Sequence, residues 1–182
     1  MKTTMYLLTP DQQSNVRRLF NNLLTDLKTR NEGIYNEFVT APAAKSHHQN
    51  YKGGLLEHSG KFAMWLYGRA LAKEDLDISV EECVKIGFFH DFCKLFLYIP
   101  NNGAYWVNSD VYPHHAKRSV EIAKELGYNF SQKEKICILL HMAGGWWNDE
   151  DEEELTASDR RWISKNLRLV SAIQWADMKA CE

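Results

Sequence analysis

The sequence contains no long hydrophobic run, which sets a first limit on where the protein works. No stretch of the 182 residues approaches the roughly 20 apolar residues that a membrane-spanning helix needs. The apolar run at the N-terminus is also too short for a signal peptide. We therefore expect a cytoplasmic protein that makes no membrane contact.

Cysteines are few and do not form sequence pairs. The four of them are scattered without a CxxC spacing, at Cys83, Cys93, Cys137 and Cys181. This arrangement argues against both a disulfide framework and a zinc knuckle. Three of the four lie in apolar surroundings, where a reduced cysteine behaves as a small core residue.

The chain also lacks a strong charge of either sign. Its 22 basic and 24 acidic residues leave a formal net charge of −2, which argues against a protein that holds duplex nucleic acid by bulk electrostatics. A local basic groove remains open, because net charge says nothing about distribution. The acidic run at 149–154 is typical of a solvated loop. Length and composition indicate one ordinary globular domain spanning residues 1–182.

Helix signals run along most of the chain. Thr9-Pro10-Asp11-Gln12 combines a cap, a first-position proline and a capping-box glutamine. Further helices are expected over about 31–40 and 55–73, from Ser79 to about 91, from Pro113 to about 126, from Ser131 to about 142, and from a Ser158 cap onward. Residues 104–107 could be extended, but no strand pattern is convincing. The fold class predicted is all-α, a single-domain helical bundle.

Several polar residues fall inside apolar runs, where they must face the core. His58 lies early in the helix that follows Gly53-Gly54, and His90-Asp91 closes the run Gly87-Phe88-Phe89. His141 ends the apolar run 136–140, and Asp177 lies within the apolar run 172–178. Burying one such group without a partner costs several kcal/mol. Because imidazole and carboxylate together suit first-row divalent metals, a metal ion is the most economical shared partner.

Alternatives exist for each of these residues taken singly. A lone core histidine is more often hydrogen-bonded to a backbone carbonyl, and Asp177 alone could pair with a neighbouring Lys or Arg. The adjacent pair His90-Asp91, taken together with His58 and Asp177 on other helices, favours the metal interpretation.

The pattern resembles the HD superfamily of metal-dependent phosphohydrolases. That family carries a His, then a His-Asp pair, then a distant Asp, which match His58, His90-Asp91 and Asp177 here. Lys94 completes the His-Asp-x-x-Lys signature, with Cys93 where glycine is usual. His115 and His141 match the additional histidines of members that hold two metals, although His114 remains an alternative to His115. The resemblance covers about 42–178 and implies an HD-type helical bundle.

Within the superfamily, the closest motifs are those of the HD domain of YhaM-type 3′–5′ exoribonucleases. The similarity lies in 42–48, which includes His47 and His48, and in Gly53-Gly54-Leu55-Leu56-Glu57-His58. Those enzymes carry a separate nucleic-acid-binding domain in front of the HD domain, and we do not expect the 182 residues of this sequence to have room for one. The expected substrate is therefore a nucleotide or a short oligonucleotide.

The resemblance implies roles for individual residues. The metal ligands would be His58, His90, Asp91, His115, His141 and Asp177, with Asp91 bridging two ions. Asp91 and Lys94 would be catalytic, while Lys94, His47 and His48 would contact substrate. Lys94 has an alternative as an exposed lysine at a helix end, and His47 and His48 as ordinary loop residues. Trp146 and Trp147 could stack a base, or serve the core or a lid.

The function expected is hydrolysis of a phosphodiester or phosphoanhydride bond by a metal-activated water. One or two divalent ions are expected, and Mn, Fe, Co, Ni and Zn all accept this ligand mixture. A single-metal nucleotide monophosphatase or deoxynucleoside triphosphatase is the enzymatic alternative. A non-catalytic nucleotide-binding HD module is the alternative from another class. A homo-oligomer is left open.

Overall fold

The first two helices begin at the caps that the sequence predicts. In the computed structural model, which describes residues 8–44, 49–72, 76–102, 104–108, 115–142 and 155–182, α1 spans Pro10–Arg30. The Thr9 side chain accepts a hydrogen bond from the Gln12 amide, and the Gln12 side chain accepts one from the Thr9 amide. Asn31 ends α1 and caps α2 (Glu32–Phe38) through the Ile34 amide.

The next three helices carry the chain through the centre of the molecule. Helix α3 spans Gly54–Leu71 and follows Gly53, whose positive φ of 86° favours glycine. Helix α4 (Val80–Phe89) starts with the predicted capping box between Ser79 and Glu82. A short turn then leads into α5 (Lys94–Leu97).

A two-stranded hairpin follows α5. Strand β1 (Tyr98–Asn101) pairs antiparallel with β2 (Ala104–Val107), so that Tyr98 lies opposite Val107 and Ile99 opposite Trp106. The extended form expected for 104–107 is confirmed. The expectation of no clear strand was wrong for β1, since four residues that include a proline are too short to show alternation.

The C-terminal half is helical again. Helices α6 (His115–Glu125) and α7 (Gln132–Leu139) agree with prediction, including the stop at Gly127 (φ 85°) and the Ser131 cap. The expected single last helix capped by Ser158 was wrong. It is divided into α9 (Ala157–Lys165) and α10 (Leu167–Ala180), and Thr156 caps α9. The Asn166 side chain donates to the Trp162 carbonyl and interrupts the helix.

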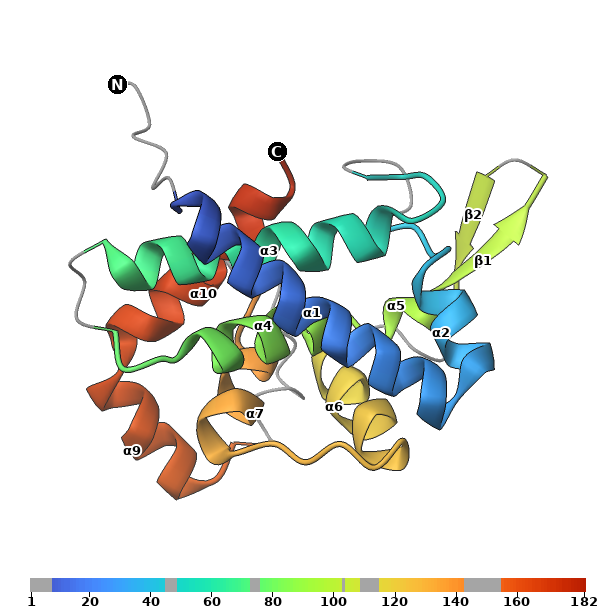
Figure 1. Cartoon of the computed structure of the whole chain (residues 1–182). Helices are drawn as coiled ribbons and strands as arrows, with labels where there is room; N and C mark the ends of the chain where they lie inside the picture. Colours follow the sequence, from blue (N-terminus) through green and yellow to red (C-terminus); the bar gives the residue numbers. More distant parts are fainter. Residues whose placement is uncertain (1–7, 45–48, 73–75, 103, 109–114, 143–154) are drawn as a thin grey trace.

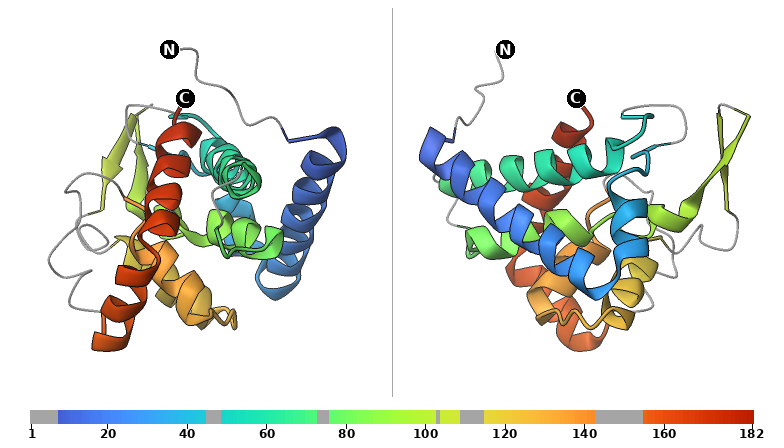
Figure 2. Two further views of the ribbon diagram at one scale, coloured as in Figure 1. Left: turned by 90° about the vertical axis from the view of Figure 1, so that its left-hand side faces the viewer. Right: turned by 45° about the vertical axis from the view of Figure 1, so that its right-hand side comes forward.

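The helices pack as a bundle around α3 and α4, which confirms the predicted all-α fold class. Helix α1 crosses the face of α3 and α4 (Figure 1), and α3 lies between α1 and α10 (Figure 2). Beneath them is a cluster of fully buried aromatic rings, Phe38, Phe62, Phe88, Phe89 and Phe92. Within the described residues, no helix is both long and apolar enough to cross a bilayer.

Gly87 sets the separation of α3 and α4. A Cβ at this position would lie 3.0 Å from both the Cβ and the amide nitrogen of Ala63. We expect Gly87→Ala to lower the free energy of unfolding by about 1–3 kcal/mol, because the two helices must move apart. Gly60→Ala on α3 is the matched control, since a Cβ there meets no atom within 4 Å. It should raise stability by about 0.5–1 kcal/mol. Urea denaturation measures the stability of both variants. Equal changes in the two would contradict the close approach of α3 and α4 at Gly87.

Candidate metal centre

Four predicted ligands meet in the interior, where three helices converge. His58 projects from α3, His90 and Asp91 lie in the turn after α4, and Asp177 lies on α10. His58 Nε2 is 3.1 Å from both His90 Nε2 and Asp177 Oδ1, and 3.4 Å from Asp91 Oδ2. The structure therefore brings together residues up to 119 positions apart in the chain.

These separations suit the ligands of one ion. Zinc–nitrogen and zinc–oxygen bonds of about 2.0–2.2 Å place neighbouring ligand atoms roughly 3.0–3.5 Å apart. His90 Nε2 lies 3.4 Å from Asp91 Oδ2 and 3.6 Å from Asp177 Oδ1. Imidazole nitrogens and carboxylate oxygens are the donors that first-row divalent metals accept. This group of buried His and Asp residues could hold a metal ion.

Backbone carbonyls set the tautomers of two histidines. His90 Nδ1 is 2.9 Å from the Gly87 carbonyl oxygen, and His141 Nδ1 is 2.7 Å from that of Ile138. A carbonyl only accepts, so each Nδ1 carries the hydrogen. In the neutral ring, the lone pair is then on Nε2, which points into the cluster. This is the arrangement that orients metal-ligating histidines.

Asp91 also belongs to a second group, with His115 and His141. The ligand atoms of these three residues lie within 4.8 Å of one another. His141 Nε2 is 3.5 Å from Asp91 Oδ1, and neither of these buried atoms has a hydrogen-bond partner. Unpaired buried polar atoms are costly. Asp91 thus turns Oδ2 to the first group and Oδ1 to the second.

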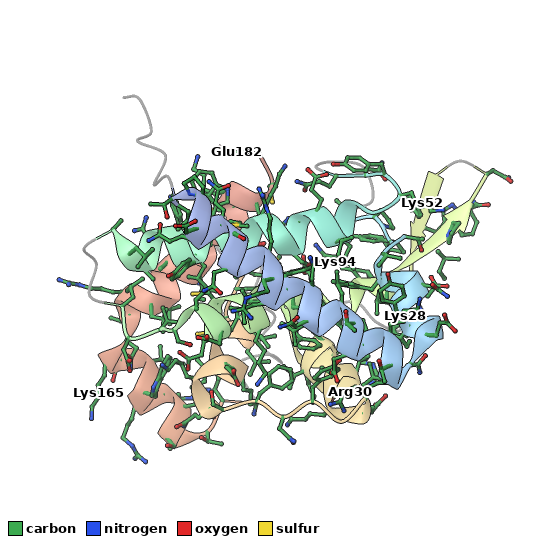
Figure 3. The ribbon with its side chains drawn as sticks, viewed as in Figure 1. Lys28, Arg30, Lys52, Lys94, Lys165 and Glu182 are labelled. Carbon is green, nitrogen blue, oxygen red and sulfur yellow. The ribbon has the colours of Figure 1, made fainter. Side chains whose placement is uncertain are left out.

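Lys94 is held against the same carboxylate. Its Nζ lies 2.6 Å from Asp91 Oδ2, and only 14% of its side chain is exposed. The alternative of an exposed lysine at a helix end is therefore wrong. Figure 3 shows Lys94 within the outline of the molecule, while Lys165 projects from its edge. Burial acts to lower the pKa of Lys94, but the Asp91 carboxylate, together with Tyr98 and Asp177, outweighs burial and raises it.

The two carboxylates make the first group attractive to cations. Burial acts to raise the pKa of Asp91, but Lys94 and His90 hold it well below its usual range. Burial would lower the pKa of His90, but Asp91 and Asp177 raise it to about 9. In the second group, burial and the neighbouring ring of His141 lower the pKa of His115 to about 3. His115 is therefore neutral near pH 7, as a metal ligand must be, whereas His90 must release a proton when an ion binds.

Three supporting residues escaped the sequence analysis as parts of the site. The Phe62 ring stacks on His90, with centroids 4.3 Å apart. Ser119 Oγ accepts a hydrogen bond from the Cys93 amide and so fixes the turn that carries Asp91. Gln174 Nε2 donates to the Leu140 carbonyl beside His141. Only Ser119 left a signal in the sequence, because it follows His115 by four residues, a step that places both on one face of a helix.

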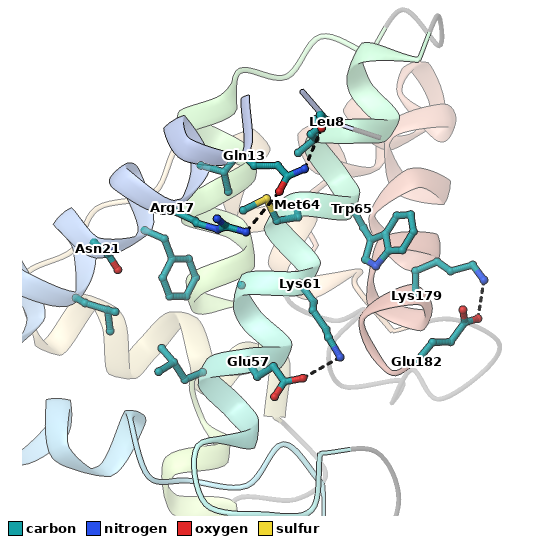
Figure 4. A pocket seen from close by; sticks show the side chains of 15 residues that line it. Leu8, Gln13, Arg17, Asn21, Glu57, Lys61, Met64, Trp65, Lys179 and Glu182 are labelled. Atoms are coloured by element: carbon teal, nitrogen blue, oxygen red, sulfur yellow. Dashed lines mark hydrogen bonds and ion pairs between the residues drawn. The ribbon is translucent and has the colours of Figure 1, made fainter. Parts of the chain in front are cut away.

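Other predicted contributors lie outside the described residues. These are His47, His48, the alternative ligand His114, the two tryptophans Trp146 and Trp147, and the acidic run 149–154. Among the described residues, a cavity of about 660 Å³ lies between α1, α3 and the end of α10. It is bordered by the pairs Glu57–Lys61 and Lys179–Glu182 (Figure 4). None of the six predicted ligands lines it, so this cavity is separate from the metal centre.

Comparisons with models of protein families, with curated proteins and with solved structures find no significant match to this chain.

Proposed function

We propose that this protein is a metal-dependent phosphohydrolase of the HD type, which cleaves a phosphodiester or phosphoanhydride bond of a nucleotide or short oligonucleotide. One observation carries the proposal. A single buried carboxylate, Asp91, faces two groups of His and Asp donors and is also held by the ammonium of Lys94. Paired metal sites that share a ligand, with a cation beside them, suit the negative charge of a phosphoryl group.

The proposed ligand roles follow from the atoms described above. His58, His90 and Asp177 would hold one ion together with Asp91, whose Oδ2 faces them, while His115 and His141 would hold a second together with the same carboxylate, whose Oδ1 faces His141. Divalent ions held in this way supply a water of lowered pKa and neutralise phosphoryl oxygens.

The remaining residues orient the metal ligands, place a positive charge at the site and exclude bulk water from it. The Gly87 and Ile138 carbonyls keep His90 and His141 in the tautomer that turns Nε2 inward. Lys94 supplies a fixed positive charge next to Asp91, where it would bind an oxygen of the phosphoryl group of the substrate. The aromatic cluster around Phe62 excludes bulk water and so strengthens these electrostatic interactions.

The experiment that tests the function is a turnover assay after metal loading. The purified protein is supplied with Mn²⁺, Co²⁺ or Zn²⁺ and given nucleoside mono- and triphosphates, linear and cyclic dinucleotides and a short single strand. Hydrolysis of one class, lost on chelation and restored by metal, is the expected result. Tight nucleotide binding without turnover under all three metals would instead support a non-catalytic binding module.

A single-metal enzyme is the second candidate, because the first group alone offers four donors. The variant His115→Ala distinguishes the two-metal enzyme from the single-metal enzyme. In the two-metal enzyme this change should lower the bound metal from about two ions per chain to about one, since His115 belongs only to the second group. Elemental analysis measures the content. Asp177→Asn is the matched variant in the first group. One ion in the wild type, unchanged in His115→Ala, would favour a nucleotide monophosphatase or deoxynucleoside triphosphatase.

A further inference from the structure

Two side chains of the candidate metal centre are partly exposed to solvent. Among the two ligand groups and Lys94, the most exposed side chains are Asp177 at 15% and Lys94 at 14%. Those of His58, His90, Asp91 and His141 are almost completely buried. Among the described residues of the centre, Lys94 and Asp177 are therefore the ones that a substrate meets first, and residues that border them can contact its remaining parts.

Tyr98 is close to Lys94 in the chain. Lys94 begins the four-residue helix α5, and Tyr98 directly follows its last residue and begins β1, so the two residues are about one helical turn apart. Tyr98 is half-buried. Tyr98 is thus a near neighbour of this partly exposed cation along the chain.

Tyr105 extends this aromatic surface from the second strand. Its ring lies diagonally across the hairpin from Tyr98, with centroids 6.5 Å apart and the planes at 62°. Strand register places Tyr98 opposite Val107 and Tyr105 opposite Pro100, so all four side chains share one face of the hairpin. Ile99 and Trp106 form a pair on the other face. The hairpin stands out from the helical body at the end of α5 (Figure 1).

A positive charge next to a pair of aromatic rings matches the two ends of a nucleotide. The phosphate of a nucleotide carries negative charge, and its base has a flat π-face that stacks on aromatic side chains. One sugar separates the two, a distance comparable with one helical turn. A sugar phosphate without a base would use Lys94 and leave the rings unused.

We propose that the Tyr98–Tyr105 face of the hairpin holds the nucleobase of the substrate and is the element that makes the site prefer nucleotides over base-free phosphate esters. This inference rests on the proposed phosphohydrolase function. Tyr105 acts as a specificity-determining residue that touches the base and takes no part in bond cleavage.

The test uses Tyr105→Ala, with Tyr105→Phe and Trp106→Ala as controls. Trp106 is adjacent in the same strand, faces the other way and is 64% exposed. For the nucleotide that the wild type hydrolyses, Tyr105→Ala should raise KM about tenfold or more and leave kcat within about twofold, as expected from loss of base stacking. The affinity for ribose 5-phosphate, which has no phosphodiester or phosphoanhydride bond and serves as a binding probe, should not change. Tyr105→Phe and Trp106→Ala should behave as the wild type.

A binding measurement keeps this test independent of turnover. Titration calorimetry with adenosine, guanosine, cytidine and uridine 5′-monophosphates is compared with ribose 5-phosphate, for the metal-loaded wild type and each variant. If the wild type prefers nucleotides to ribose 5-phosphate, and this preference is lost in Tyr105→Ala but kept in Trp106→Ala, the inference is supported. This holds even if no nucleotide is hydrolysed, because that result counts only against the proposed function. Equal affinity of the wild type for nucleotides and ribose 5-phosphate, or an unchanged preference in Tyr105→Ala, would overturn it.

Discussion

Asp91→Asn is expected to remove both bound ions and to lower kcat/KM for the nucleotide substrate by at least about a thousandfold, equivalent to several kcal/mol of transition-state stabilisation. The effect is large because Asp91 alone among the described residues belongs to both ligand groups. An amide keeps the size of the side chain but offers one neutral oxygen in place of two charged ones. Elemental analysis and steady-state kinetics measure the two losses.

The same variant leaves the buried ammonium of Lys94 without its carboxylate. Removing one partner of a buried ion pair costs about 3–5 kcal/mol of folding stability. The Asp91→Asn variant should therefore also unfold at a lower temperature. Asp91→Asn/Lys94→Met removes both charges and should recover much of that stability without recovering metal or activity. Circular dichroism verifies that each variant is folded. A folded double variant that still binds two ions would contradict the role of Asp91.

Asp159→Asn is the matched control for this substitution. Asp159 is also a buried carboxylate, but it serves the start of α9, where it accepts hydrogen bonds from the Thr156 amide and hydroxyl and from Gln132. Its replacement should cost about 1 kcal/mol of stability as a weakened cap. Metal content and turnover should remain those of the wild type.

Lys94→Met is expected to act in opposite directions on metal binding and on catalysis. The Lys94 ammonium lies 2.6 Å from Asp91 Oδ2, the oxygen that also faces His58 and His90. Two unit charges of like sign at 4 Å repel by about 4 kcal/mol at an effective dielectric constant of 20. Removing the lysine therefore relieves repulsion toward a divalent ion. We expect the affinity for the metal to rise about tenfold or more. This is less than the full repulsion implies, because the lysine of the wild type can move partly away from the ion.

Catalysis should fall in the same variant, because the fixed positive charge beside the phosphoryl group is lost. A drop of about a hundredfold in kcat is expected for removal of one such group. Calorimetric titration with Zn²⁺ or Mn²⁺ and steady-state kinetics supply the two readouts. Lys61→Met, which removes a lysine paired with Glu57 on the surface of α3, should change neither. Weaker metal binding in Lys94→Met would show that Lys94 orients Asp91 for the ion instead of competing with it.

Interactions between residues close together in the sequence made much of the fold predictable. The capping boxes at Thr9, Ser79 and Ser131 each depend on residues three apart, so the sequence contains the whole interaction. The error at the last helix arose where Thr156 and Ser158 both offer a cap. The third residue after Thr156 is Asp159, which completes the box. The third residue after Ser158 is Arg161, which cannot accept a hydrogen bond from the cap amide.

The candidate site was predictable for a different reason. His58, His90, Asp91 and Asp177 each lie in an apolar run, and polar residues there must find partners inside the protein. That constraint identifies which residues converge without giving their distances. The neighbours that adjust the site depend on tertiary approach: the Gly87 contact with Ala63, the Phe62 ring on His90 and the Tyr98–Tyr105 pair across the hairpin. The spacing of residues along the sequence does not indicate these contacts.

The most direct measurement is anomalous X-ray scattering from crystals of the protein loaded with Zn²⁺ or Mn²⁺. The expected result is two peaks roughly 3.5–4 Å apart. One should be surrounded by His58, His90, Asp91 and Asp177, and the other by Asp91, His115 and His141. Peaks at other positions, or none at either group in metal-saturated crystals, would contradict the proposal that this buried cluster is a metal centre.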